Sequence, residues 1–202
     1  SLAKPNVAEP IAVKEKREDR EPEAATGFHA KNSVIANDFM VAAANPYASE
    51  AGYNILKQGG SAVDAAIAVQ LVLTLVEPQS SGIGGGAFIL HWEKKESALT
   101  TFDGRETAPK AAKADMFLKE DGQPMRWIDA VIGGRSVGVP GVMHALHRAH
   151  QLHGKLPWNA LFTDAIKLAE NGFIVSPRLE RLVGIRMNPG LAKLPVINAY
   201  FY

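Results

Sequence analysis

An arginine that follows an expected strand has the type and position best suited to binding a substrate. Arg105 stands within residues 102–109, directly after a glycine that permits a bend. A guanidinium presents a planar fork of donors and can hold a carboxylate at two points, whereas lysine offers only a point charge. The local alternative is a salt bridge of Arg105 with Asp103 or Glu106, and the neighbouring residues by themselves favour that alternative.

A serine framed by glycines matches the nucleophile elbow of serine hydrolases. Residues 134–138 fit the motif G-x-S-x-G, in which a sharp strand-to-helix turn exposes the serine. However, Pro140 disfavours helix just before it, and no histidine follows His153 to complete the order Ser, Asp, His. We therefore do not assign Ser136 as a nucleophile. The sequence has no cysteine, which also excludes a thiolate nucleophile.

Four histidines recur every third residue in an expected helix: His144, His147, His150 and His153. Each step of three residues falls about 60° short of a full helical turn, so the row spirals around the helix instead of sharing one face. No carboxylate stands among them at the spacing of a metal site. We interpret the row as a partly solvated helix face, and we predict neither a metal nor a cofactor.

A glycine run at residues 82–86 matches the dinucleotide fingerprint G-x-G-x-x-G/A, and Asp103 lies near the expected distance for a ribose-binding acid. That fingerprint requires a strand before the loop and a helix after it. Here an apolar helical segment precedes the glycines and a short strand follows them, so a nucleotide site is rejected. The run instead indicates that backbone comes close to another surface.

The expected elements include both helices and strands. Asn45 and Ser61 are predicted helix N-caps, and Gly154 and Gly172 are predicted stops. In chain order the predictions are a buried strand at 40–44, helices at 46–58 and 62–76, a hairpin at 87–92 and 98–103, and helices at 141–153, 158–171 and 177–187.

The helix expected at 62–76 is apolar on almost every side, which predicts a place between layers of a multilayer fold. It is shorter than the roughly 20 residues that cross a bilayer, so we expect no membrane span. Lysine and arginine number 22 against 21 acids, without a basic stripe, so we expect no nucleic-acid partner.

The two ends of the chain differ from its middle. Residues 1–37 lack apolar periodicity and mix both charges, which predicts a mobile N-terminal arm, with the globular portion at 38–202. The last residues, 191–202, are largely apolar and uncapped, as expected of a chain that is cut or that meets a partner.

Several motifs in colinear order closely resemble the large-subunit part of γ-glutamyltranspeptidases, over roughly residues 32–190. Each motif alone is weak, but their combination is specific. They are Asn45-Pro46, Gly59-Gly60-Ser61-Ala62-Val63-Asp64-Ala65-Ala66, Ser81-Gly82-Ile83-Gly84-Gly85-Gly86, Arg105-Glu106-Thr107-Ala108-Pro109, Ser136-Val137-Gly138-Val139-Pro140-Gly141 and Gly172-Phe173.

The resemblance implies an α/β (α+β) fold that is part of a four-layer αββα N-terminal-nucleophile hydrolase sandwich, incomplete in this chain. It implies a periplasmic or secreted proenzyme that cleaves itself into large and small subunits. A threonine at the start of the small subunit would attack the γ-glutamyl amide of glutathione, and water or an amino acid would accept the glutamyl group. The 202 residues alone are expected to be inactive.

Carried over residue by residue, the resemblance makes Arg105 the group that binds the glutamyl α-carboxylate, which reverses the local preference for a salt bridge. The nucleophile, the oxyanion-hole glycines and a pair of serines would all belong to the small subunit, so Ser80 and Ser81 are not that pair. Two alternatives stay open: a related cephalosporin or glutaryl acylase, and a non-catalytic structural or binding subunit.

Overall fold

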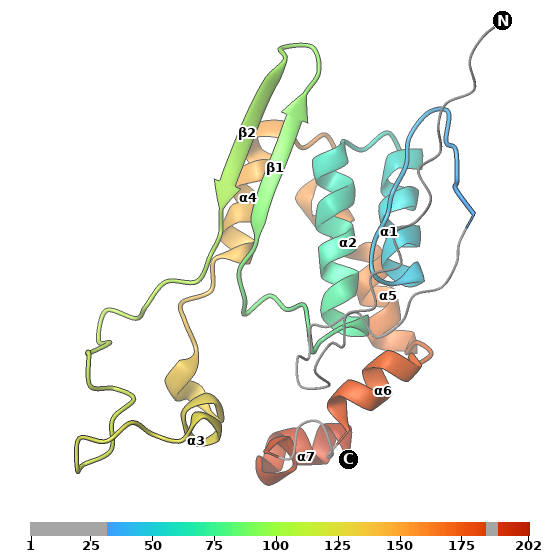
Figure 1. Ribbon diagram of the computed structural model, residues 1–202. Coiled ribbons are helices and arrows are strands. Elements are labelled where there is room, and N and C mark those ends of the chain that lie inside the picture. Colours follow the sequence, from blue (N-terminus) through green and yellow to red (C-terminus); the bar gives the residue numbers. More distant parts are fainter. Residues whose placement is uncertain (1–31, 185–189) are drawn as a thin grey trace, which may run out of the picture.

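The computed structural model describes residues 32–184 and 190–202. It consists of a helical body, a β-hairpin and a long excursion that joins β2 to α4 and extends away from both (Figure 1). The excursion is defined as residues 105–140. The elements in order are α1 (Pro46–Lys57), α2 (Ala62–Val76), β1 (Phe88–Glu93), β2 (Ala98–Asp103), α3 (Trp127–Val131), the 3-10 turn η1 (Gly134–Ser136), α4 (Val142–His153), η2 (Trp158–Phe162), α5 (Thr163–Asn171), α6 (Pro177–Val183), η3 (Leu191–Lys193) and α7 (Pro195–Phe201).

Both predicted N-caps start the first two helices. The Asn45 side chain accepts the backbone N–H of Tyr47 at 3.1 Å, and Pro46 occupies the first turn of α1. Ser61 and Asp64 form a capping box at α2, in which each side chain accepts the other residue's backbone N–H. These local bonds explain why the predicted boundaries of α1 and α2 are confirmed.

The core lies where α1, α2, α4 and η2 meet. Ile67 and Val72 of α2 are fully buried, as are Ala48 of α1 and Ala149 of α4. The predicted burial of α2 on nearly every side is only partly right, because Ala62 and Ala66 are exposed. These small side chains lie near the start of the helix, where they line an open pocket together with residues 40–42 and are not covered completely.

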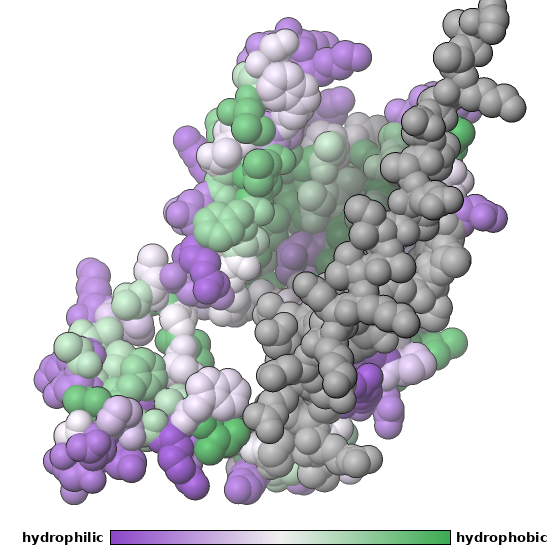
Figure 2. Space-filling model, in the orientation of Figure 1, coloured by the Kyte–Doolittle hydropathy of each residue, from purple (hydrophilic) through white to green (hydrophobic). Residues whose placement is uncertain are grey.

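The predicted hairpin is confirmed, with β1 and β2 antiparallel and Phe88 opposite Asp103. Because successive strand residues point to opposite faces, one face packs against the body through Ile89 and Phe102. The other face presents Phe88, Leu90 and Trp92, which are 66%, 70% and 58% exposed. Apolar side chains are visible along the hairpin in Figure 2.

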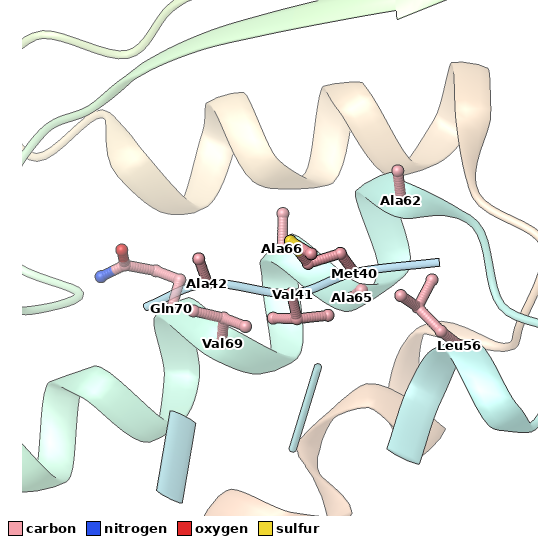
Figure 3. A pocket seen from close by; sticks show the side chains of 9 residues that line it. All are labelled: Met40, Val41, Ala42, Leu56, Ala62, Ala65, Ala66, Val69 and Gln70. Atoms are coloured by element: carbon pink, nitrogen blue, oxygen red, sulfur yellow. The ribbon is translucent and has the colours of Figure 1, made fainter. Parts of the chain in front are cut away.

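The buried strand predicted at residues 40–44 is wrong. The segment is irregular chain that has no strand partner within the described residues, and Met40 is 57% exposed. A strand needs a neighbour to satisfy its backbone groups, and here the neighbour is a helix. Met40, Val41 and Ala42 line a pocket of about 290 Å³ over α2 (Figure 3).

The later helices agree with the sequence except at their ends. The helix predicted at 158–171 begins as η2 before it continues as α5, and Gly154 and Gly172 cap α4 and α5 as predicted. The prediction at 177–187 is met by α6, but residues 185–187 lie outside the described residues. Helix α7 forms at 195–201, where no helix was predicted.

Most of the predicted N-terminal arm, residues 1–31, lies outside the described residues, and residues 32–37 are exposed without helix or strand. Among the described helices, none has both the length and the apolar character needed to cross a membrane.

Candidate functional site

Arg105 follows β2 and begins the excursion. The Asp103 side chain accepts the backbone N–H of Arg105 at 2.9 Å, which turns the chain away from the strand. The Arg105 side chain is 66% exposed, and its Nη1 donates to Oε2 of Glu106. The salt bridge considered from the sequence therefore forms with Glu106, while the Asp103 carboxylate contacts only the backbone N–H of Arg105 and not its guanidinium.

Close backbone contacts fix the position at which the excursion begins at Arg105. Gly104 exchanges backbone hydrogen bonds with Ala87, at 2.9 and 3.2 Å. A Cβ atom added to Gly141, at the start of α4, would lie 2.4 Å from the Gly104 carbonyl oxygen, so only glycine fits there. The end of β2 and the start of α4 are thus held at backbone contact beside Arg105.

The glycine run makes room for the partner of Arg105. A Cβ atom on Gly86 would lie 2.4 Å from Oε2 of Glu106 and 2.7 Å from the carbonyl oxygen of Gly104. By contrast, Gly84 has no heavy atom within 4 Å of such a Cβ position. The close approach predicted for this run is confirmed at Gly86, and the approaching group is the Glu106 side chain of the same chain.

A backbone bridge brings the two ends of the excursion together. Thr107 pairs with Val139 in antiparallel orientation, through hydrogen bonds of 3.4 and 2.9 Å. The pair borders a pocket of about 330 Å³, called here the arginine pocket. Its lining residues are Arg105, Glu106, Thr107, Ala108, Pro109, Ala112, Met116, Phe117, Arg135, Ser136, Val137 and Gly138.

The arginine pocket contains a second guanidinium that the sequence analysis did not single out. Nη1 of Arg135 donates to the carbonyl oxygen of Met116 at 2.6 Å, which ties η1 to the far wall of the pocket. Within the residues that the structure describes, no carboxylate lies at salt-bridge distance from Arg135. The motif at residues 134–138 was considered only for a serine nucleophile, so the sequence analysis gave no role to Arg135.

Ser136 lines the same pocket but has a structural partner. Its hydroxyl donates to the carbonyl oxygen of Val131 at 3.2 Å. None of the pocket's lining residues is a histidine that could take a proton from it. This geometry agrees with the decision not to assign Ser136 as a nucleophile.

The histidine row of α4 spreads over different neighbours. His147 and His150 both meet the ring of Trp158 edge-on, and His150 Nε2 lies 2.8 Å from the Leu156 carbonyl oxygen. His153 stacks on His91 of β1 with ring centroids 3.9 Å apart. In the described ranges no cluster of three metal-ligating side chains occurs. Three of the four histidines therefore pack between α4 and its neighbours, while His144 is exposed.

A buried carboxylate also serves the fold. Asp64 is 0% exposed, and its Oδ2 accepts the backbone N–H groups of Ser61, Lys155 and Leu156 at 2.8 to 3.1 Å. These bonds join the start of α2 to the loop after α4. Since its accepting oxygen is engaged with backbone, Asp64 acts as a structural link between segments far apart in the sequence.

Comparison with known proteins identifies relatives over most of the chain. Residues 48–202 match the family model described as Gamma-glutamyltranspeptidase. A curated relative, the glutathione hydrolase proenzyme of Bacillus subtilis, is 43% identical over 153 residues, which is 76% of this chain and 26% of that protein. The chain thus spans about a quarter of the length of this relative.

Two solved structures show the same architecture. A gamma-glutamyltranspeptidase from Pseudomonas nitroreducens complexed with L-DON is 35% identical with a TM-score of 0.76, over 83% of this chain and 49% of that chain. A cephalosporin acylase from Bacillus halodurans is 31% identical with a TM-score of 0.65, over 90% of this chain and 32% of that chain. Both likenesses extend over more than four fifths of this chain.

Proposed function

The chain belongs to the gamma-glutamyltranspeptidase family, and on this premise we propose that it holds the γ-glutamyl donor for a glutathione-cleaving acyltransferase. The observation that carries the proposal is the position of Arg105, exposed at the end of β2 and lining the arginine pocket. An exposed, rigidly anchored guanidinium suits the α-carboxylate of a glutamyl group.

The ion pair with Glu106 is compatible with this role. It engages Nη1 of Arg105, and the described residues place no hydrogen-bond acceptor on Nε or Nη2. Glu106 is itself held against Gly86 and Gly138 and is less exposed than the arginine, at 26% against 66%. Glu106 therefore orients the guanidinium of Arg105. The remaining donors of Arg105, on Nε and Nη2, stay available for a substrate carboxylate.

The proposed reaction needs a second polypeptide segment, the small subunit of the same proenzyme. Its N-terminal threonine attacks the γ-amide carbon, and the hydroxyl proton passes to the threonine's own α-amine. That proton then goes to the leaving nitrogen as the amide bond breaks, which leaves a γ-glutamyl ester. Water or the amine of an amino acid or peptide attacks the ester and regenerates the hydroxyl. Arg105 contributes by fixing the donor through its α-carboxylate, without taking part in proton transfer.

Hydrolytic removal of a glutaryl side chain from a cephalosporin is the second candidate, because the Bacillus halodurans cephalosporin acylase shares this fold over 90% of the chain. A glutaryl side chain carries a terminal carboxylate but no α-amino group. Both substrates would use the guanidinium, so Arg105 alone does not separate them. Parallel assays with glutathione and a glutaryl-cephalosporin decide between the two candidates.

Two further parts of the proposal rest on family membership. The mature enzyme is periplasmic or secreted, and residues 38–202 act only together with the small subunit. A preparation of the 202 residues alone should not hydrolyse a chromogenic γ-glutamyl anilide. Arg105-dependent turnover by that preparation would refute the last point.

The test is made on the complete processed enzyme that contains this chain. Arg105→Lys should raise KM for a γ-glutamyl anilide about tenfold or more, since a two-point grip on the carboxylate becomes a single contact. Arg148→Lys is the matched control, because Arg148 is an exposed arginine of α4 outside the pocket. Equal kinetics for the two variants would exclude Arg105 as the donor contact, and a complete enzyme without any hydrolysis would favour a non-catalytic subunit.

A further inference from the structure

A buried carboxylate stands at the point where the chain leaves the helical body for the hairpin. Glu77 directly follows α2, and its side chain is 6% exposed. Three side-chain donors reach this carboxylate: Asn45 Nδ2 at 3.3 Å, Gln79 Nε2 at 2.5 Å and Arg178 Nε at 3.3 Å. Because a carboxylate removed from water is stable only when its oxygens are paired, the three donors hold Glu77 in one place.

Through these donors, Glu77 joins the end of α2 to α1 and α6. Asn45 caps α1 with the oxygen of its side chain and binds Glu77 with the nitrogen. Arg178 lies in the first turn of α6, where Leu179 and Leu182 are buried at 4% and 2% exposure. In Figure 1 the chain leaves α2 beside α6 and then runs to β1. The ion pair therefore connects residues that are 101 positions apart in the sequence.

The backbone that follows Glu77 is bound to it. The Glu77 carbonyl oxygen accepts the backbone N–H groups of Ser80 and Ser81 at 3.0 and 2.9 Å. Gln70 of α2 donates its side-chain N–H to the Ser81 hydroxyl at 2.7 Å. The turn at residues 77–81 is thus fixed to α2, and its orientation depends on the position of Glu77.

The same segment ends in the glycines that lie against Glu106. The Gly85 N–H donates to the Gly82 carbonyl oxygen at 3.2 Å, so a closed turn leads from the two serines to Gly86. A Cβ atom on Gly85 would lie 3.5 Å from Oε1 of Glu106, and one on Gly86 would lie 2.4 Å from Oε2. Since Glu106 is paired with Arg105, a shift of this segment would move the ion pair at the arginine pocket.

We propose that Glu77 is a positioning residue for Arg105, and that it makes donor binding depend on the placement of α6. Its carboxylate holds the start of residues 77–86 against α1 and α6, and this segment fixes Glu106, which orients the guanidinium. The inference rests on the proposed function and adds this dependence to it. Glu77 acts through other residues and does not touch the substrate. Displacement of α6 would therefore weaken the binding of the donor.

Hydrogen exchange on the complete protein that contains this chain tests the first step without an activity assay. Glu77→Gln keeps the size of the side chain but removes its charge, and Arg178→Gln removes the same ion pair from the side of α6. Each variant should speed exchange of the Ser80 and Ser81 amides about tenfold, because their acceptor is no longer held in place. Unchanged exchange in both variants would overturn the inference, whether or not the protein cleaves a γ-glutamyl donor.

Kinetics on the complete processed enzyme test whether the effect reaches Arg105. With a γ-glutamyl anilide as donor, Glu77→Gln and Arg178→Gln should each raise KM about fivefold with kcat little changed. The double variant should show no further increase, because the two side chains act as one pair. Fully additive increases in KM would mean that the two residues act separately and would contradict the proposal.

Leu161→Ala is the control for a general loss of stability. Leu161 is 1% exposed in η2 and does not line the arginine pocket, so its truncation should lower the urea midpoint and leave KM unchanged. Equal KM increases for Leu161→Ala and Glu77→Gln would reduce Glu77 to a structural role. Unchanged KM in Glu77→Gln beside a raised KM in Arg105→Lys would overturn the inference alone. If Arg105→Lys also leaves KM unchanged, the proposed function itself fails.

Discussion

The helical body and the excursion both contain apolar residues, but the body buries them and the excursion leaves them at least partly exposed. In the body, Ile67, Val72 and Ala149 are 0% exposed. In the excursion, no residue from 105 to 140 is buried, and Trp127 is 75% exposed. Figure 2 shows the excursion as a separate lobe with apolar and polar side chains intermixed on its surface.

The difference follows from how each region spaces its apolar residues. The body places them at helical intervals, so α1, α2 and α4 present continuous apolar stripes to one another. The excursion scatters them over turns, the short helix α3 and the 3-10 turn η1, none of which offers a stripe. Because the excursion forms no apolar core of its own, its charged side chains lie at the surface. The arginine pocket is formed by residues of the excursion.

The largest expected contrast comes from removing one apolar side chain in each region. Ile67→Ala should lower the free energy of unfolding by about 3–4 kcal/mol, because it leaves a cavity in a fully buried site. Trp127→Ala should change it by less than about 0.5 kcal/mol. Urea unfolding of the complete enzyme measures both values. Equal losses would break the comparison and show that the excursion is covered in the assembled enzyme.

Removing a carboxylate in each region should give the next contrast. Asp64→Ala leaves three partly buried backbone N–H groups without their acceptor and should cost about 3 kcal/mol. Asp64→Asn retains an acceptor oxygen and should cost less. In the excursion, Asp129→Ala should leave the unfolding midpoint unchanged, since its salt bridge with Arg126 is exposed. A comparable loss at Asp129 would contradict this contrast.

A substitution at the junction between the body and the excursion should weaken substrate binding. Gly86→Ala forces Glu106 and the Gly104 carbonyl to move, which disturbs the ion pair of Arg105. KM for a γ-glutamyl anilide should rise about tenfold, the equivalent of about 1.4 kcal/mol. Gly84→Ala is the matched control, because its new methyl group meets open space. Similar KM values for both variants would show that Gly86 does not influence substrate binding through Glu106.

The smallest expected effect is the titration of Asp129 in the excursion. A hydrogen bond from Arg126 lowers the pKa of the Asp129 carboxyl. Its stabilising contribution is therefore present above the pKa of the unfolded chain and is lost as pH falls through the lower folded value. An NMR titration should give a midpoint below the usual value of about 3.9, and Arg126→Gln should restore it. An unshifted midpoint would mean that the ion pair does not persist in solution.

The predicted class of fold is confirmed by the gamma-glutamyltranspeptidase and acylase structures, which place the chain in an incomplete α/β N-terminal-nucleophile hydrolase. The predicted helix caps and the hairpin also hold, since these signals act between residues three or four apart or across one turn. The strand at 40–44 failed because a strand depends on a neighbour that the local sequence does not describe.

For the candidate site, the sequence pointed to Arg105 but not to what surrounds it. The neighbouring residues by themselves favoured a salt bridge, the family resemblance indicated a contact with the substrate carboxylate, and that role stays a prediction. Arg135 was missed because its motif was weighed only for a serine nucleophile. Nothing local in residues 134–138 indicates that they meet residues 105–109, since one distant bridge brings the segments together.

By itself, the sequence determined the caps at Asn45 and Ser61, the hairpin and the glycine stops, because short-range hydrogen bonds and steric rules fix these features. Only the tertiary structure decided that Glu106 fills the space beside Gly86, that Arg105 and Arg135 line one pocket, and that α2 keeps an uncovered face. These features depend on contacts between distant segments, whose free energy becomes available only when the whole body has folded.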